Sequence, residues 1–552
     1  MANFSSIFWG CLALCAAMTF RSSGYYKKIS ERNKSNKDDE DELSDDVKKA
    51  HNNLLRKYLF VYLLATLSDW LQGPYVYALY SDYGFEQHEI AQLFVAGFGS
   101  SMIFGSFVGG IADSGGRKKF VIIFALVYLG SCITKRKWEL HIYLVYVCVC
   151  VRERERENMI IYFVIMMQIC LSNLFVFYIL LFWTCILSFS DFRNYSMLML
   201  GRLLGGVSTS LLFSVFEAWL IKAHADAELP KQCLPKSFSW AAFGNSAVAI
   251  LAGLVANKIA HAGPMEPVTD VIYKGGFLNP FDLAIVSLIF CAGGAFFLWD
   301  ENYGDTGETI SGERETNAKG KGKWHSALKN ALTTTLRNRD IVLCGVISSF
   351  FEGSMYIFVF MWTPLLKAFR KEGEGDLPFG LIFATFMVCC MTGSSLFSIL
   401  VEKFPVEKLG IAVFAVAAFG MSIVALEIND TVSFLGMNLF EICVGMYFPI
   451  MGTMKGGIVP EDKRAAIYNL YRIPLNFIVL FSLLTDLTPR FSFMLNATML
   501  TIATVLQAVL SKRRLESLGI QENNSLSTED TTPLVTNGEV SDNSPTDSSS
   551  AV

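Results

Sequence analysis

Long apolar stretches alternate with short polar ones along most of this chain. Six of them lie at 58–80, 90–112, 119–134, 197–221, 238–260 and 281–299. Six more lie at 340–366, 379–401, 407–427, 432–452, 465–485 and 490–510. Most come close to the ~20 residues that an α-helix needs to cross a bilayer, where each segment has to satisfy its own backbone polar groups. The pattern predicts an all-α integral membrane protein with 12 core transmembrane helices in two six-helix halves, 58–299 and 340–512.

Four further segments flank or separate the two halves. The apolar run at 1–22 fits a cleaved signal or an N-terminal anchor helix, and the absence of a small-residue cleavage site favours the anchor. The segment 23–57 is rich in charge and predicts a linker. A second polar segment, 300–339, predicts a cytosolic linker between the halves. The tail 513–552 is rich in Ser, Thr, Asp and Asn, a composition typical of disorder.

Lysine and arginine gather in alternate loops, which indicates how the helices are oriented. Basic residues follow the second, fourth, sixth, eighth and tenth stretches, and they include Arg117–Lys119, Lys222, Lys231, Lys236, Lys403, Lys408, Lys455, Lys463 and Arg464. The loops at 81–89 and 427–431 contain none. By the positive-inside rule the basic loops face the cytosol. One loop disagrees, because Lys367, Arg370 and Lys371 fall on the predicted outer side.

The composition agrees with a membrane protein and gives no sign of an enzyme. Hydrophobic residues make up 52% of the 552 positions and charged residues 17%, compared with about 25% charged in soluble domains. The 13 cysteines lie mostly in apolar stretches and lack metal-ligand spacing. There is no phosphate-binding loop, Ser-His-Asp pattern, zinc-binding helix or basic domain. We therefore expect no enzymatic activity, no cofactor, no metal site and no nucleic-acid partner.

The segment 136–195 breaks the pattern of the first half. Within it, Val147–Val151 alternates valine with cysteine, and Arg152–Glu157 alternates arginine with glutamate. Translation of two adjoining dinucleotide repeats in non-coding DNA would give two such alternating runs of residues. We interpret the segment as a retained intron, with a genuine lineage-specific loop that carries a re-entrant hairpin as the alternative.

Weak internal symmetry between the halves supports this interpretation. Ser101 and Glu217 of the first half have counterparts in the second. They are 116 positions apart, whereas their counterparts Ser395 and Glu441 are only 46 apart. Removal of the inserted residues would reduce the first separation to 56.

Six ionisable side chains lie within apolar stretches, where charge is costly and commonly marks a functional site. They are Asp69, Arg202, Glu217, Glu352, Glu441 and Arg472. A guanidinium offers a planar fork of donors that suits a tetrahedral oxyanion. Arg472 is therefore the best candidate for binding an anionic substrate, and a structural ion pair with Glu441 or Glu352 is the alternative. The carboxylates could relay protons, or they could only neutralise the arginines.

A short charged turn joins the second and third stretches. Gly109, Asp113, Gly116, Arg117 and Lys118 form a Gly-x-x-x-Asp-x-x-Gly-Arg-Lys pattern. It resembles the signature loop of the major facilitator superfamily of secondary transporters, although an ordinary basic loop is the alternative. The resemblance implies that Asp113 and Arg117 latch helices at the cytosolic face and gate a conformational change.

Longer motifs are similar to the molybdate-anion transporter branch of that superfamily. They are Asp69–Tyr75, Gly201–Arg202, Phe216–Trp219, Phe351–Ser354, Trp362–Pro364 and Arg472–Leu475. The likeness covers about residues 55–135 and 196–512, and it implies a twelve-helix core and molybdate uptake by alternating access. Arg202 and Gly206 match the Arg-x-x-x-Gly pattern of the fourth helix, which implies helix packing or proton linkage.

The resemblance also implies a binding site for a divalent tetrahedral oxyanion at the membrane midplane. Four residues could supply its donors, namely Arg472, Gln72, Tyr75 and Asn476. Proton coupling could pass through Asp69, Glu217, Glu352 or Glu441. Transport of an organic solute such as a sugar, and a non-transporting membrane sensor or scaffold, are the alternative functions. We expect molybdate or a related oxyanion, protons and membrane lipid as partners, and a plasma-membrane location, with an endomembrane or the vacuole as alternatives.

Overall fold

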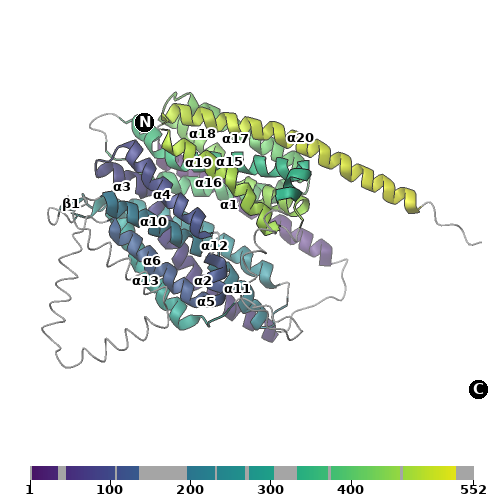
Figure 1. The fold of residues 1–552 in the computed structure, drawn as a ribbon, viewed down its shortest axis with the longest axis horizontal. Coiled ribbons are helices and arrows are strands. Elements are labelled where there is room, and N and C mark those ends of the chain that lie inside the picture. The colour runs from purple at the N-terminus through teal and green to yellow at the C-terminus, as the bar shows by residue number, and fades with distance from the viewer. Residues whose placement is uncertain are drawn as a thin grey trace, which may run out of the picture.

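The computed structural model describes residues 3–34, 45–105, 108–135, 195–230, 233–267, 273–303, 332–370, 375–460, 464–485 and 487–529. Within these residues the chain forms a bundle of α-helices in which the two halves of the sequence lie side by side (Figure 1). The segment 136–194, most of the 300–339 linker and the tail from 530 onward lie outside the described residues. The predictions about those segments stay predictions.

The described residues of the first half contain nine helices, several of which meet end to end within one crossing. They are α2 (Asp45–Gln72), α3 (Val76–Asp82), α4 (Gln87–Gly105), α5 (Val108–Gly115), α6 (Arg117–Thr134), α10 (Tyr195–Leu212), α11 (Val215–Asp226), α12 (Cys233–Ala260) and α13 (Asn279–Leu298). A 3-10 turn at Gly73–Tyr75 separates α2 from α3, because Pro74 has no backbone N–H to continue the helix. A small antiparallel pair, β1 (Glu266–Pro267) and β2 (Tyr273–Lys274), lies between α12 and α13.

In the second half, the structure describes six longer helices. They are α15 (Arg339–Ala368), α16 (Phe379–Leu400), α17 (Val406–Ala425), α18 (Asp430–Ile458), α19 (Arg464–Leu484) and α20 (Pro489–Glu529). An asparagine precedes the first residue of α15 and of α18. The Asn338 side chain accepts a hydrogen bond from the Asp340 N–H at 2.9 Å, and the Asn429 side chain accepts one from the Val432 N–H at 2.8 Å. Both are N-caps that satisfy backbone donors otherwise left without a partner.

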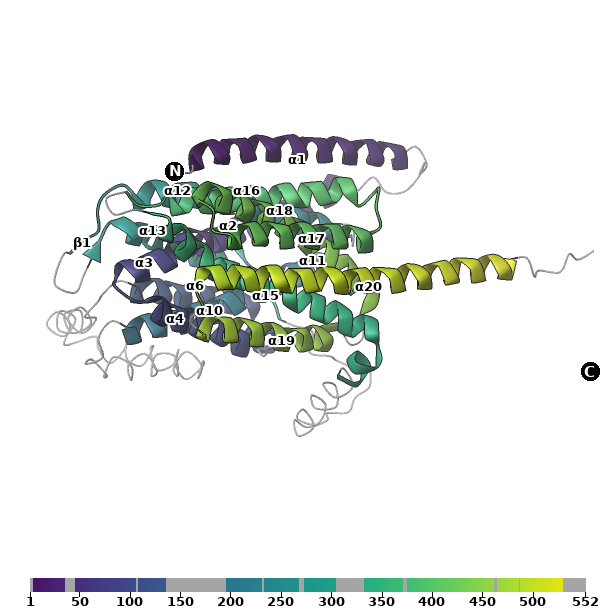
Figure 2. The same cartoon turned by 90° about the horizontal axis from the view of Figure 1, so that it is seen from above.

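An additional helix, α1 (Phe4–Lys34), lies outside both halves and runs along α16 (Figure 2). Phe8, which is 2% exposed, packs in a cluster with Ala384 and Val388 of α16. Further along, the hydroxyl groups of Thr19 and Ser395 are 3.1 Å apart. This arrangement suits an anchor helix within the membrane, and the segment predicted to end at 22 continues as helix to Lys34.

The helix boundaries differ from the prediction at polar ends. α2 begins at Asp45, inside the predicted linker, and α20 continues to Glu529, well into the predicted disordered tail. The physical reason is the abundance of Lys, Arg, Leu and Glu in these stretches, residues with good helix propensity that can extend a membrane helix into water.

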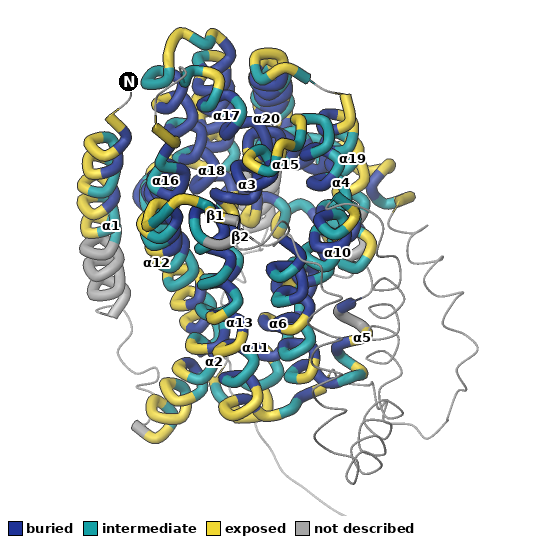
Figure 3. The backbone as a smooth tube through the Cα atoms, turned by 90° about the vertical axis from the view of Figure 1, so that its left-hand side faces the viewer, coloured by how far each residue is buried: buried dark blue, intermediate teal, exposed yellow. Residues whose placement is uncertain are grey.

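The surface of the bundle is apolar, as a bilayer requires. Nine of the described helices are long and apolar enough to span a membrane, and α1 is one of them. Large apolar side chains face outward, including Phe297 at 83% and Phe20 at 81% exposure. Buried positions gather where helices face each other, and exposed ones follow the free side of α1 (Figure 3). The chain is therefore an integral, multi-pass membrane protein.

The two halves are joined at their predicted outer ends. Lys367 Nζ donates to Ser81 Oγ at 3.0 Å, and Gln87 Nε2 donates to the Leu487 carbonyl at 3.1 Å. Just below, the Phe360 ring packs edge-on against two rings of the first half, those of Tyr77 at 5.5 Å and Phe94 at 5.2 Å. These contacts close the outer side of the interface between the halves.

Candidate functional site

A cavity of about 430 Å³ lies between the two halves. Its walls come from α2, α4, α6 and α10 of the first half and from α15 and α19 of the second. Five charged residues line it, namely Asp69, Lys135, Arg202, Glu352 and Arg472. The volume is of the size that holds a small ligand, and so many charges in a membrane protein point to a polar solute pathway.

The first-half wall carries a compact polar cluster. The Tyr128 hydroxyl donates a hydrogen bond to the Asp69 carboxylate. Lys135, directly after α6, donates to the side-chain oxygen of Gln72 at 2.7 Å. The Gln72 amide group in turn donates to the Ser68 carbonyl at 2.8 Å. Because each member has its partner, the cluster holds the lysine in a fixed position beside the cavity.

Arg202 is placed on the same side by contacts around its guanidinium. Its Nε donates to the Leu93 carbonyl at 3.2 Å, and the group lies 4.4 Å from the centre of the Phe94 ring. Gly97 makes room for it, because a Cβ there would lie 3.1 Å from Arg202 Nη2. Among the described residues, no carboxylate lies within ion-pair distance of Arg202. Its charge is therefore available to the cavity.

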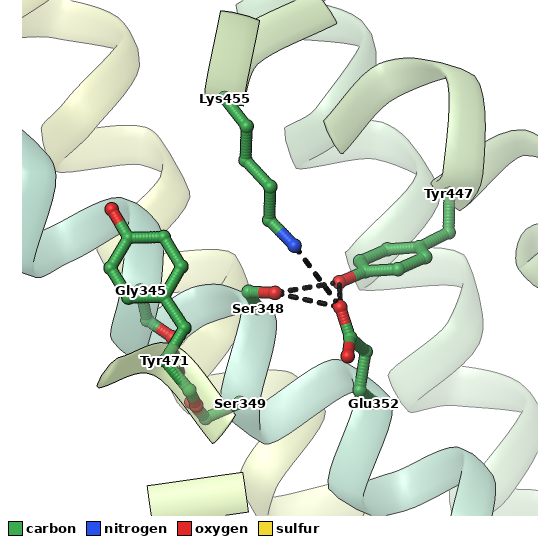
Figure 4. A network of polar contacts seen from close by, with 7 residues as sticks. All are labelled: Gly345, Ser348, Ser349, Glu352, Tyr447, Lys455 and Tyr471. Carbon is green, nitrogen blue, oxygen red and sulfur yellow. Dashed lines mark hydrogen bonds and ion pairs between the residues drawn. The ribbon is translucent and has the colours of Figure 1, made fainter. Parts of the chain in front are cut away.

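The second-half wall holds a cluster around Glu352 of α15 (Figure 4). Three donors converge on the same carboxylate oxygen, Oε1. Ser348 and Tyr447 each donate at 2.8 Å, and Lys455 Nζ lies 3.2 Å away. Tyr447 is itself fixed by stacking on Phe351, with ring centres 4.1 Å apart. Glu352 is thus neutralised by a lysine of its own half.

Arg472 and Asn476 face the cavity from one side of α19, one helical turn apart. The alternative prediction for Arg472 was an ion pair with Glu441 or Glu352. Neither pair is formed among the described residues, since Glu352 binds Lys455 instead. Like Arg202, Arg472 therefore presents a guanidinium without a carboxylate partner in the described part of the chain.

The charged turn before α6 is tied to its own half. Arg117 forms an ion pair with Asp113 at 2.7 Å and donates to the Ala218 carbonyl of α11 at 3.0 Å. The Glu301 carboxylate accepts the Lys118 N–H at 2.8 Å at the start of α6. Gly116 has a φ of +101°, a conformation that side chains rarely adopt, and Glu301 fills the space where its Cβ would be.

Comparison with protein families agrees with this architecture. Residues 4–150 and 165–445, well over half of the chain, match a family described as sugar transporters with 12 transmembrane segments. The chain belongs to the major facilitator superfamily. The match is interrupted at 151–164, within the segment interpreted above as an insertion.

Curated relatives of this superfamily member are named molybdate-anion transporters. The relative from Takifugu rubripes is 30% identical over 466 residues, which cover 80% of this chain and 81% of the relative. The one from Danio rerio is 30% identical over 456 residues, 79% of each chain. The resemblance inferred from the motifs is therefore confirmed at the level of the branch.

Solved transporters share the fold at much lower identity. A crystal structure of a D-xylose-proton symporter aligns with a TM-score of 0.52 and 14% identity, covering 82% of this chain and 95% of that one. The tetrameric PepTSo2 structure aligns with a TM-score of 0.53 and 11% identity, covering 86% and 99%. The predicted superfamily fold is confirmed, whereas such distant structures say nothing about the substrate.

The structure brings together most of the predicted site residues of this transporter, but not all. Asp69, Gln72, Arg202, Glu352, Arg472 and Asn476 line the cavity. Tyr75 does not: it is fully buried beside Phe277 and Phe379, and its hydroxyl accepts the Gly380 N–H at 3.3 Å. Glu441 is buried within α18, and Glu217 is exposed at the start of α11. Neither lines the cavity.

Two lysines of the site were not among the predicted site residues. Lys455 was counted as a cytosolic loop charge, but it lies inside the last turns of α18 and points at Glu352 (Figure 4). Lys135 directly precedes the suspected insertion. The only signal for either was a lysine next to an apolar stretch, which is also the pattern of an ordinary loop charge.

Proposed function

We propose that this protein carries molybdate across a membrane by alternating access. The observation that supports this most directly is the pair Arg202 and Arg472. The two guanidiniums face one cavity from opposite halves, and neither has a carboxylate partner among the described residues. A bound dianion would give both charges a partner and would contact the two halves at once. The names of the curated relatives favour molybdate as that dianion.

The donors around the cavity suit a tetrahedral oxyanion. Each guanidinium can donate two parallel hydrogen bonds to a pair of oxygens. The Asn476 amide lies one turn from Arg472 and can supply a further donor. Gln72 already uses its amide group to bind Ser68, so it contributes mainly by holding the neighbouring lysine. Tyr75 lies outside the cavity, and we do not include it among the ligands.

The closed outer interface supports a state that opens toward the cytosol. The contacts of Lys367 with Ser81 and of Phe360 with Tyr77 close the outer side. Phe213, which lines the cavity at the bend between α10 and α11, is 73% exposed. The opposite state would require these outer contacts to separate while the cytosolic ends approach. We assign Asp113 and Arg117 to the latch that controls this movement.

Inward transport of a dianion needs an energy source. Moving it against a negative interior costs about 2.3 kcal/mol per charge per 100 mV, or about 4.6 kcal/mol for two charges. Proton coupling would offset this cost. We place the coupling at Asp69 and Glu352, because these two carboxylates line the cavity. We expect the plasma membrane as the location, where uptake from outside would take place.

Uptake of labelled molybdate into vesicles that contain the purified protein tests the proposal. We expect saturable uptake that is stimulated by an inward proton gradient and inhibited by sulfate but not by sugars. Inhibition by sugars without inhibition by sulfate would favour the organic-solute alternative. Flux that does not respond to the gradient would remove the coupling.

Replacement of Arg472 by alanine separates transport from a scaffold role. We expect loss of uptake with normal folding, whereas Arg490→Ala, at an exposed arginine outside the cavity, should behave as wild type. The assay should be run on the full chain and on a version without residues 136–195. Activity confined to the shorter version would support the retained-intron interpretation.

A further inference from the structure

Lys135 carries a buried charge whose hydrogen-bond partners are both neutral. The residue is 2% exposed, and its Nζ contacts the Gln72 side-chain oxygen at 2.7 Å and the Ser131 hydroxyl at 3.4 Å. The ammonium lies 5.0 Å from the centre of the Phe281 ring. Within the described residues, no carboxylate is at ion-pair distance. A buried ammonium without a counter-ion is costly, so the fold keeps it at the expense of stability.

The carboxylates around the cavity do not form an ion pair with Lys135 in the described part of the chain. Asp69 lies on the same wall of the cavity, but its carboxylate receives the Tyr128 hydroxyl. Glu352, across the cavity, is neutralised by Lys455. Lys135 and Arg202 therefore leave the first-half wall with one positive charge in excess of Asp69. A second unpartnered positive charge, Arg472, lies on the other wall.

The orientation of Lys135 suits a ligand. An ammonium has three N–H donors, and the acceptors found for it in the described part of the chain are Gln72 and Ser131. Both are neutral, so they position the group without cancelling its charge. The backbone of Lys135 is fixed as well, because Tyr83 donates its hydroxyl to the carbonyl at 2.8 Å. A fixed charge without an ion-pair partner at a cavity wall is prepared to receive an anion.

We propose that Lys135 is a binding residue that selects divalent over monovalent tetrahedral oxyanions. This inference rests on the proposed function. It adds the residue through which the affinity of the site depends on the charge of the substrate. When Asp69 is counted against Arg202, the two arginines leave one net positive charge, which suits a monovalent anion, and Lys135 raises it to two. The second negative charge of a divalent anion is attracted by the Lys135 ammonium. A monovalent anion would gain much less binding free energy from the same ammonium.

The experiment compares two tetrahedral anions that differ in charge. Molybdate is the divalent probe and perrhenate, a tetrahedral metal oxyanion, is the monovalent one. Equilibrium binding of each to the purified full chain is measured for wild type, Lys135→Gln and Lys135→Arg. Lys258→Gln removes an exposed lysine that does not line the cavity and serves as the matched control.

We expect Lys135→Gln to weaken molybdate binding by about tenfold or more while perrhenate binding changes far less. The preference for the divalent anion should fall accordingly, and Lys135→Arg and Lys258→Gln should keep it. Equal weakening of both anions would mean that the lysine only supports the wall, and would overturn the inference. So would loss of the preference in the arginine variant. Lys135→Met, which keeps the apolar stem, replaces the glutamine variant if that one does not fold.

The experiment distinguishes failure of the role proposed for Lys135 from failure of the proposed transport function. If wild type binds molybdate and the neutral variants keep its preference for the divalent anion, only the role of Lys135 is wrong. If wild type neither binds nor takes up divalent oxyanions, the proposed function is wrong and this inference falls with it.

Discussion

Removal of the Lys455 ammonium, by the substitution Lys455→Met, tests the cluster around Glu352. The substitution keeps the apolar stem and leaves the carboxylate with two neutral donors, Ser348 and Tyr447. The ion pair has an N–O distance of 3.2 Å, with side chains 18% and 27% exposed. It is therefore neither a surface pair nor a fully buried one.

The expected change in the free energy of unfolding follows from this intermediate burial of the ion pair. Exposed ion pairs contribute about 0–1 kcal/mol, and loss of one partner of a buried pair costs about 3–5 kcal/mol. We expect Lys455→Met to lower the free energy of unfolding by about 1–3 kcal/mol, between these limits. Glu352→Gln should also destabilise, since it leaves Lys455 without its carboxylate. The double variant removes both charges, so it should be more stable than the sum of the single effects predicts.

The assay is a double-mutant cycle on the free energy of unfolding of the purified protein in mixed micelles. We expect a coupling between the two positions of about 1 kcal/mol or more. Lys258→Met, at an exposed lysine outside the cluster, should change little and serves as the control. Single effects that simply add in the double variant would refute the reasoning, because the two charges would then not depend on each other.

Three further predictions concern other parts of the molecule. Arg472→Lys keeps the charge but loses the planar fork, so we expect the molybdate KM to rise by about ten- to a hundredfold, less than for alanine. Gly116→Ala forces a side chain into a φ of +101° and against Glu301, and should cost about 1–3 kcal/mol of stability, measured by unfolding. Sequencing of transcripts across the codons for Lys135 and Tyr195 should show an abundant message without the repeats; an abundant message with them would contradict the retained intron.

The fold could be predicted from the sequence because the bilayer leaves few choices. An apolar stretch of sufficient length has to become a helix, and alternate basic loops give its direction. The ends of the helices could not be predicted in this way. The polar residues after Ser511 continue α20 to Glu529, since nothing in hydropathy distinguishes a water-exposed helix from a disordered tail.

The candidate site was predictable as far as charge within an apolar stretch reveals it. Asp69 and Glu352 stand out by this criterion and line the cavity. Glu441 stands out equally but is buried within α18 away from the cavity, because hydropathy does not say which neighbour a helix face meets. Tyr75 is the last residue of the 3-10 turn Gly73–Tyr75, and this turn changes the direction of its side chain relative to a continuous helix. Lys455 was missed because it follows the predicted apolar stretch 432–452, where a lysine is indistinguishable from an ordinary loop charge.

Lys135 lines the cavity and also directly precedes the suspected insertion, so the proposed binding site and the suspected insertion lie next to each other in the chain. Tyr83 holds the carbonyl of Lys135, while the Tyr195 hydroxyl donates to the Glu89 carbonyl at 3.1 Å and its ring lies 5.5 Å from that of Phe85. Lys135, directly before the suspected insertion 136–195, and Tyr195, its last predicted residue, are thus both anchored to the segment that runs from the end of α3 into the first turn of α4. The described residues on either side of 136–194 therefore lie on the same outer side of the bundle, and removal of the suspected insertion would leave the direction of every later helix unchanged. Because Lys135 is also the proposed charge-selecting residue, we expect a substitution at this junction to change oxyanion selectivity.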